Sequence, residues 1–348
     1  MSFIFNAWYA AAWSHEVKPA QMSKRTILEQ KIVLYRTSSG QAVALQDRCP
    51  HRFVPLSLGS VKDDRVECCY HGLQFDCTGA CVHNPHGTGR IPLAAKVKSY
   101  PVIDRCSLLW IWMGEEPADF DKLPSFPMME ADSGYRVVRG ETVLRANYVV
   151  IGENLLDLSH VPFLHEGLLG SKDGLGIEPV LHTDGDDLQV DRFMRNISVP
   201  TAFDLLFRQD GKPVDQWMNM RWNPPGAYLI DVGVHAPGES REKGVWYYGC
   251  HTLTPETSKS TRYHFAAAWP PGGKDLDPET AARLAEIRRT AFEDQDKPIL
   301  DAIQEEMGDA EFWGMKPALF QVDAAPIRMR RTVERLVAED RAKRSGIV

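Results

Sequence analysis

The sequence predicts an α+β protein of two domains, an all-β module at residues 1–116 and a larger domain of strands and helices at residues 136–348. Three observations lead to this prediction. The chain of 348 residues is longer than one typical domain. Apolar runs rich in β-forming residues fill its first part, whereas helical patterns appear only later. A proline-rich passage within residues 117–135 predicts the linker between the two domains.

The strands of the N-terminal module are predicted from short apolar runs bounded by turn residues. Residues 26–36 and 41–47 are two such runs, separated by a Ser-Ser-Gly sequence that is typical of a hairpin turn. Residues 66–68 and 73–76 predict short strands that flank a loop, and residues 108–113 predict a buried final strand. The module is therefore expected to be built from antiparallel hairpins.

The second domain is predicted to mix helices with a long strand-rich stretch. Residues 185–270 alternate as strands do, for example in Ala227–Val234. Asp277 is the expected N-cap of one helix, and Pro162 is expected to interrupt another. The predicted helices cover residues 148–157, 278–304 and 328–343.

Composition excludes several classes of protein. A formal net charge of −7 gives no electrostatic footprint for nucleic acid, and no apolar run approaches the roughly 20 residues of a membrane span. The N-terminus does not have the pattern of a signal peptide. Neither a GxGxxG motif nor a Walker loop is present, so the chain is not expected to bind a dinucleotide. The odd number of cysteines, seven, favours a reducing cytoplasm and metal ligation over disulfides.

Two short segments each place a cysteine just before a histidine. Cys49 precedes His51, and Cys68 precedes His71. This is the ligand set of a Rieske [2Fe–2S] cluster, in which two cysteines hold one iron and two histidines hold the other. A structural zinc takes the same ligand types and is the alternative. The matching order within each pair, in a loop-like context, favours two equivalent loops that close over a cluster.

The other cysteines are interpreted as packing thiols. Among them Cys69 is the one close enough to a proposed ligand to confuse the assignment. These residues are Cys69, Cys77, Cys81, Cys106 and Cys250.

A second motif lies between residues 154 and 165. His160 and His165 follow the carboxylate of Asp157, which indicates a mononuclear iron site that could receive electrons from the cluster. The alternative is one buried, hydrogen-bonded histidine and one surface histidine. The two motifs occur in the order and at the separation found in one class of enzyme, and this coincidence favours the metal site.

Together the two motifs resemble the oxygenase component of the Rieske non-haem iron aromatic oxygenases, and most of all the vanillate O-demethylase and dicamba monooxygenase group. The resemblance covers nearly the whole chain. Further segments that carry it are residues 6–9, 81–87, 253–257 and 323–335.

This resemblance implies a helix-grip (START-like) second domain and an Fe(II) held by His160, His165 and a later aspartate. It also implies that Asp157 bridges His160 to His71 of a neighbouring subunit, in a head-to-tail homotrimer. Asp157 and Asn154, one helical turn apart, are the candidate catalytic residues. The alternative for Asp157 is an ordinary helix residue or a solvated charge.

The third iron ligand is expected to be Asp296, with Asp294 as the alternative. The family places its aspartate in a late helix, five residues before an acidic residue followed by a small one, and Asp296 fits because Asp301 precedes Ala302. Pro298 lies inside this predicted helix and disfavours the α conformation just before it. Asp296 could then merely cap a helix that restarts.

His251 and Asp231 match substrate-pocket positions of the resembling enzymes and could hydrogen-bond an aromatic acid. The alternative is a histidine at a sheet edge and a solvated aspartate. Arg289 could face a substrate carboxylate from the late helix, although a solvated charge is the better interpretation. The sequence departs from the group at Trp269–Gly273, so its substrate can differ from vanillate.

The resulting hypothesis is an O₂-dependent monooxygenase that removes a methyl group from a methoxylated aromatic acid and releases formaldehyde. Electrons would come from NAD(P)H through a separate flavin and iron–sulfur reductase or a ferredoxin. Hydroxylation of an aromatic ring or a benzylic methyl group is the alternative reaction. The non-enzymatic alternative is a Rieske electron carrier, which has no reason to keep His160 and His165.

Overall fold

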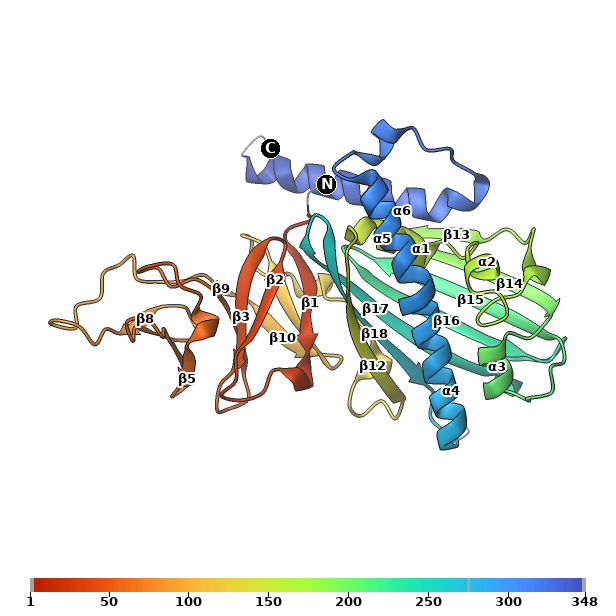
Figure 1. The fold of residues 1–348 in the computed structure, drawn as a ribbon, viewed down its shortest axis with the longest axis horizontal. Helices are drawn as coiled ribbons and strands as arrows, with labels where there is room; N and C mark the ends of the chain where they lie inside the picture. The colour runs from red at the N-terminus through yellow and green to blue at the C-terminus, as the bar shows by residue number, and fades with distance from the viewer. Residues whose placement is uncertain (1–2, 274–275, 346–348) are drawn as a thin grey trace. The chain divides into compact units, whose positions relative to one another are not determined.

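The computed structural model describes residues 3–273 and 276–345, which form two compact units (Figure 1). The first unit contains Phe3–Ser125 and Thr254–Ser258. The second contains Phe126–Leu253 and the chain from Lys259 onward. In the described part of the chain, no helix has both the length and the apolar character needed to cross a membrane.

The first unit is all β, as the sequence predicts. It contains three antiparallel sheets, of strand orders β1-β11-β10, β2-β3-β4-β9 and β5-β6-β7-β8. The final strand of the unit, β11, is buried along its whole length. The strands are β1 Ala7–Trp13, β2 Ser23–Ile27, β3 Gln30–Arg36, β4 Ala42–Gln46, β5 Ser60–Lys62, β6 Arg65–Glu67, β7 Gln74–Phe75, β8 Cys81–His83, β9 Ser99–Tyr100, β10 Val102–Arg105 and β11 Leu108–Met113.

The predicted single run at residues 26–36 is wrong, because a tight turn divides it between β2 and β3. Leu28 and Glu29 form this turn with φ values of 49° and 65°. Such left-handed conformations are rare outside glycine and asparagine, so the sequence carries no turn signal here. The backbone N–H groups of Leu28 and Glu29 donate hydrogen bonds to the carbonyls of Pro255 and Glu256 in the same unit, and these bonds satisfy the turn.

The second unit is built on one seven-stranded sheet of order β12-β18-β17-β16-β15-β14-β13. Its long strands account for the strand-like pattern of residues 185–270. They are β12 Arg136–Leu144, β13 Val180–Asp184, β14 Asp187–Ile197, β15 Val214–Asn223, β16 Ala227–His235, β17 Val245–Thr257 and β18 Ser260–Trp269.

The helices of the second unit pack on this sheet, and Figure 1 shows α4 and α5 running across it. Close packing is visible where α1 meets β16, because a Cβ added at Gly152 would lie 2.1 Å from the Tyr228 hydroxyl. Only glycine allows this approach. The helices are α1 Tyr148–Leu156, α2 Val161–Leu164, α3 Thr201–Leu206, α4 Pro278–Arg289, the π-helix η7 Thr290–Asp296, α5 Lys297–Met307 and α6 Ala324–Arg344.

Candidate metal centre and substrate cavity

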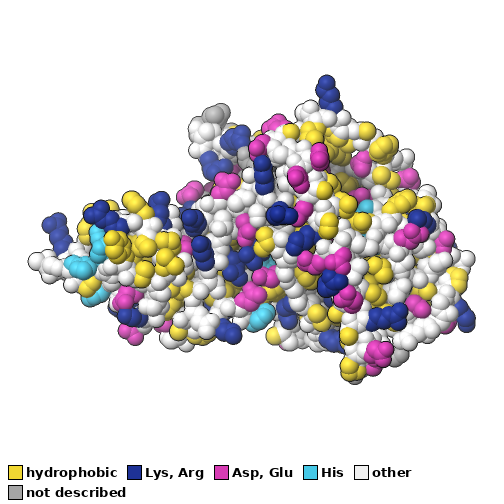
Figure 2. Space-filling model, in the orientation of Figure 1, with side chains coloured by type: hydrophobic (Ala, Val, Ile, Leu, Met, Phe, Trp, Pro, Cys, Tyr) yellow, Lys and Arg dark blue, Asp and Glu magenta, His cyan; other side chains and the backbone are white. Residues whose placement is uncertain are grey.

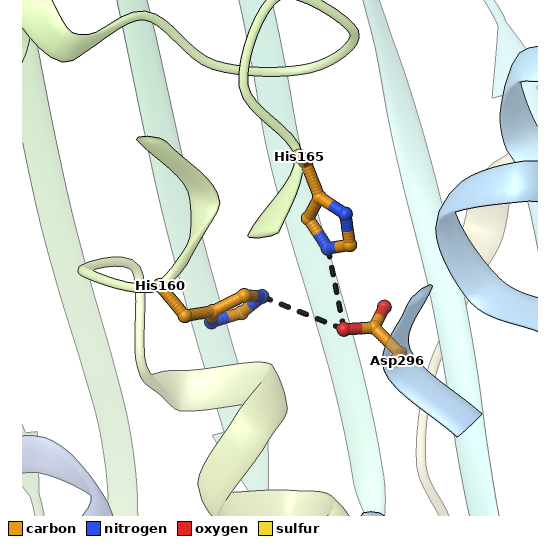
Figure 3. Close-up of side chains that lie close together, drawn as sticks. All are labelled: His160, His165 and Asp296. Atoms are coloured by element: carbon orange, nitrogen blue, oxygen red, sulfur yellow. Dashed lines mark ion pairs between the residues drawn. The ribbon is translucent and has the colours of Figure 1, made fainter. Parts of the chain in front are cut away.

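Three side chains from two distant segments converge inside the second unit (Figure 3). Asp296 Oδ1 lies 3.2 Å from His165 Nε2 and 3.7 Å from His160 Nε2. One donor atom from each of the three residues lies within 4.8 Å of the others. His165 and Asp296 are buried, with exposed fractions of 3% and 6%. Two imidazoles and one carboxylate arranged in this way can hold a divalent metal ion and leave coordination positions open.

The two histidines are positioned by a break in the helical chain. Helix α1 ends at Leu156 with Asp157 as its C-cap, and a new helix, α2, begins after His160. The predicted break is therefore real, but it lies before His160 rather than at Pro162. Pro162 sits in the first turn of α2, where its missing N–H costs no helical hydrogen bond. His160 and His165 flank this four-residue helix, so both can face Asp296.

Asp296 is the last residue of the π-helix η7, which joins α4 to α5 without a break. The Lys297 N–H donates to the Phe292 carbonyl five residues back, which is the wide π pattern. On this wider turn, residues five apart come onto one side, and Asp294 accordingly pairs with Arg289 at 2.8 Å on the surface. Asp296 lies two residues further along and is turned inward. Although Asp296 stands at the N-cap of α5, its side chain makes no capping hydrogen bond.

Each histidine is oriented by a hydrogen bond to its Nδ1 atom. His165 Nδ1 lies 2.7 Å from Gln295 Oε1, and His160 Nδ1 lies 2.5 Å from the Asp157 carbonyl oxygen. Because both partners are acceptors, Nδ1 carries the proton in each ring and Nε2 keeps its lone pair for a metal. The sequence did not predict a role for Gln295. Its only signal was its place next to the candidate ligand Asp296.

The same carboxylate affects the charge state of the two imidazoles. For His165, burial lowers the pKa, but the hydrogen bond and negative charge of Asp296 outweigh burial and raise it. For His160, burial dominates and lowers the pKa, although Asp296 and Asp157 act in the opposite direction. The negative charge of Asp296 therefore acts to raise the pKa of both imidazoles.

The two candidate catalytic residues lie beside the metal centre. The Asn154 side-chain amide donates to Asp296 Oδ1 at 3.3 Å. The carboxylate of Asp157 lies 3.9 Å from His160 Nδ1, so the hydrogen bond to this ring comes from the backbone carbonyl instead. The Asp157 carboxylate accepts hydrogen bonds from the backbone N–H and the hydroxyl of Ser159.

A largely apolar cavity of about 130 Å³ adjoins the three convergent side chains. Strands β15 to β18 form one wall, and α1, α3, α4 and η7 form the others. An engineered apolar cavity of about 150 Å³ binds benzene, so this cavity matches one aromatic ring. Its lining includes Leu158, Phe203, Met218, Met220, Ile230, Val232, Tyr247, Phe265, Trp269, Ile287 and Phe292.

Of the two predicted substrate residues, the structure brings only His251 to this cavity. His251 Nδ1 lies 2.7 Å from the Tyr263 hydroxyl, and burial together with the Arg288 charge lowers the pKa of His251 to about 4. Asp231 is absent from the described lining residues. Its carboxylate accepts two hydrogen bonds from Arg241, at 2.6 and 2.9 Å, and one from the Trp217 indole.

In the first unit, the two Cys-x-His and Cys-x-x-His segments form loops with the same hydrogen-bond pattern. The Cys49 N–H donates to the Val54 carbonyl, and the Phe53 N–H donates back to Cys49. In the second loop the Cys68 N–H donates to Leu73, and the Gly72 N–H donates back to Cys68. The fourth residue after each cysteine has a positive φ, 61° at Phe53 and 70° at Gly72. These are two matching loops.

The side chains on these loops separate into two buried thiols and two outer imidazoles. Burial, reinforced by the adjacent Cys68 thiol, raises the pKa of Cys49 to about 11. The rings of His51 and His71 lie with centroids 4.4 Å apart. A single zinc ion would need all four donors around one point. Among the described residues, the only group of three such donors within 4.8 Å is the one at Asp296, so the four loop residues fit a two-iron cluster better than zinc.

Large apolar side chains are exposed on the surface around these loops. Figure 2 shows histidine side chains beside a group of hydrophobic atoms on the first unit, and Phe53 and Tyr70 are both more than 60% exposed. The interpretation of the remaining cysteines as packing thiols is wrong for Cys69 and Cys77, which are exposed. It holds for the other three, which are buried. All seven cysteines are free thiols.

Comparisons with known proteins agree with this geometry. Residues 7–101 match the Rieske [2Fe–2S] domain, and residues 144–339 match the vanillate O-demethylase oxygenase C-terminal domain. The chain is 35% identical to the oxygenase component of dicamba O-demethylase from Stenotrophomonas maltophilia, over 97% of this chain and 98% of that one. It is 34% identical to the oxygenase component of chloroacetanilide N-alkylformylase from Rhizorhabdus wittichii, over 98% of both chains. The crystal structure of dicamba monooxygenase bound to 3,6-dichlorosalicylic acid superposes with a TM-score of 0.91 at 34% identity, covering 98% of this chain and 100% of that one.

Proposed function

Because the chain belongs to the Rieske non-haem iron oxygenases of the vanillate O-demethylase group, we propose that it demethylates a methoxylated aromatic acid and releases formaldehyde. It is an oxygenase component, so it is an enzyme rather than an electron carrier, and it uses a Rieske [2Fe–2S] cluster, a mononuclear iron and O₂. The observation that carries the proposed reaction is the one-ring apolar cavity beside His160, His165 and Asp296.

In this proposal the mononuclear iron is held by His160, His165 and Asp296. Their donor set fits Fe(II), because two imidazoles and one carboxylate are the protein ligands of such oxygenases. When bound there, the iron supplies open positions at which O₂ and a substrate C–H bond can meet. Gln295 and the Asp157 carbonyl hold the two rings with Nε2 toward the metal position. The apolar walls of the cavity exclude water around the ring of the substrate.

Cys49 and Cys68 would hold one iron of the cluster, and His51 and His71 would hold the other. The two buried thiols fit the iron that cysteines hold, and the two neighbouring outer imidazoles fit the iron that histidines hold. Histidine ligands raise the reduction potential above that of an all-cysteine cluster, which lets the cluster accept electrons from a reductase and pass them on singly.

The overall reaction balances with two external electrons. The aryl methyl ether, O₂, two electrons and two protons give the aryl hemiacetal and water, and the hemiacetal then breaks into the phenol and formaldehyde. As an oxygenase component, the protein takes these electrons from a separate protein. We propose a reductase that carries flavin and an iron–sulfur cluster, or a ferredoxin, supplied by NAD(P)H. A cytoplasmic location fits this donor and the free thiols.

We further propose that Asp157 links His160 to His71 of a neighbouring subunit in a homotrimer. The support is its place beside the metal centre, where its carbonyl already holds His160 and its carboxylate remains 30% exposed. A carboxylate in this place could connect the two imidazoles across the subunit boundary and couple electron transfer to the position of a proton.

The test of the proposed reaction is formaldehyde release. The purified protein, a generic flavin and iron–sulfur reductase, NADH and O₂ are incubated with a panel of methoxylated and methylated benzoic acids. One formaldehyde per O₂ consumed with a methoxylated acid supports O-demethylation. Hydroxylated products without formaldehyde would favour the alternative reaction, ring or benzylic hydroxylation. O₂ uptake that no member of the panel stimulates would contradict the proposal.

A further inference from the structure

The cavity beside the metal centre has one cation in its wall. Of the described residues that line the cavity, Arg288 is the only arginine or lysine. It lies on the last turn of α4, eight residues before Asp296. Residues 290–296 form the π-helix η7, which rises less per residue than the 1.5 Å of an α-helix, so the two backbones lie less than about 12 Å apart along the helix axis. The cation and the metal centre are therefore at different places along one cavity.

Arg288 has no carboxylate partner in the part of the chain that the structure describes. No hydrogen bond or ion pair joins it to another residue, and its guanidinium lies over the Trp269 ring at 5.1 Å. Its neighbour Arg289 is different, because Arg289 pairs with Glu286 and Asp294, each at 2.8 Å. Burial lowers the pKa of Arg288, although an arginine remains charged at neutral pH.

A partly buried cation without a counterion is unfavourable for the free protein. The guanidinium presents a planar fork of donors that matches a carboxylate or a sulfonate. His251 adds a second donor close by. The Tyr263 hydroxyl and His251 Nδ1 lie 2.7 Å apart, and when the hydroxyl donates this hydrogen bond, His251 Nε2 carries the ring proton. The neutral imidazole can therefore donate, but it brings no charge.

We propose that Arg288 is the anion-binding residue of this cavity, and that the substrate is a one-ring aromatic anion, a carboxylate or a sulfonate, whose charged group pairs with Arg288. This inference rests on the proposed function for the identity of the reacting group, which lies at the opposite, metal end of the ring. Trp269 forms the platform under Arg288.

The experiment measures binding without turnover. Isothermal titration calorimetry on the oxidised holoenzyme, without reductase, gives dissociation constants for two matched pairs of probes. These are 4-methoxybenzoate with 4-methoxybenzamide, and 4-methoxybenzenesulfonate with 4-methoxybenzenesulfonamide. The variants are Arg288→Gln and Arg288→Lys, and the matched control is Arg289→Gln, which removes an already paired surface arginine from the adjacent position.

Wild-type protein should bind at least one anion more tightly than its neutral partner. Arg288→Gln should weaken binding of that anion about 10- to 100-fold and change binding of the neutral partner less than about threefold, because only the anion loses a charge-assisted hydrogen bond. The affinity of Arg288→Lys for the anion should lie between those of wild type and Arg288→Gln, because lysine keeps the positive charge but lacks the planar fork of donors. Arg289→Gln should leave both probes unchanged.

A second readout separates binding from a merely structural role. Because Arg288 has no counterion in the free protein and loses only its contact with the Trp269 ring, Arg288→Gln should change the melting temperature little. A lower melting temperature together with equal losses for anion and neutral probe would overturn the proposal. So would a wild-type protein that binds no anion more tightly than its neutral partner.

The outcomes also separate this inference from the proposed function. Anion binding that depends on Arg288, without formaldehyde from any methoxylated probe, would refute O-demethylation and leave the anion site standing. Formaldehyde release from 4-methoxybenzoate that is equally efficient in wild type and Arg288→Gln would refute the anion site and leave O-demethylation standing.

Discussion

Replacing Asp296 with asparagine should remove the mononuclear iron and leave the cluster in place. The substitution keeps the shape of the side chain and removes one negative charge from a site in which Asp296 is the carboxylate beside both imidazoles. Two unit charges about 4 Å apart interact by about 4 kcal/mol at an effective dielectric constant of about 20, so a divalent ion loses about 8 kcal/mol. If relaxation and water restore half of this, about 4 kcal/mol remains, which is about a 10³-fold loss of iron affinity.

The assay is iron per chain after gel filtration, together with the visible and EPR spectra of the cluster and formaldehyde release. Wild type should hold about three irons per chain, and Asp296→Asn should hold about two, with an intact cluster spectrum and no product. Asp294→Asn is the matched control, because it removes the same charge two residues away, where the carboxylate pairs with Arg289. Loss of the third iron from Asp294→Asn but not from Asp296→Asn would refute the assignment.

Three further variants test the remaining assignments. Cys68→Ala should abolish the visible absorption and rhombic EPR signal of the cluster, whereas Cys69→Ala, which removes the exposed neighbouring thiol, should keep both; the reverse pattern would exchange the two assignments. Asp157→Asn should keep all three irons but reduce the single-turnover rate of a pre-reduced enzyme with substrate and O₂ by at least about 100-fold, and a wild-type rate would show that Asp157 plays no bridging role. Gln295→Leu should weaken binding of the mononuclear iron about 10- to 100-fold, because it removes the acceptor that orients His165; unchanged iron affinity in a metal titration would show that Gln295 does not act as an orienting residue.

Some features of the chain depend on residues that are close together in sequence, and these could be predicted. The strand β16 and the continuous burial of β11 follow from local apolar patterns, and Asp277 caps α4 as its position before Pro278 indicates. The cysteine–histidine pairs are equally local, because each pair lies on one loop whose own hydrogen bonds set its shape.

Other features depend on contacts between distant segments, and only the tertiary structure decided them. In the hairpin turn at Leu28 and Glu29, the backbone N–H groups donate hydrogen bonds to carbonyls far along the chain. The wide turn of η7 directs Asp294 to the surface and Asp296 inward, whereas a regular α-helical pattern left the two carboxylates as alternatives. Side-chain spacing alone does not reveal an inserted π turn, because its cost is offset by packing elsewhere in the fold.

The sequence by itself determined which kinds of donor atom the protein has and the order in which they occur, since short motifs fix residue type and spacing. The tertiary structure decided which members of neighbouring pairs face the cavity, namely Asp296 rather than Asp294 and Arg288 rather than Arg289. It also decided that Asp231 is held by Arg241. The physical reason is that adjacent residues on a helix point in different directions, and the direction that is inward depends on how the helix packs against the sheet.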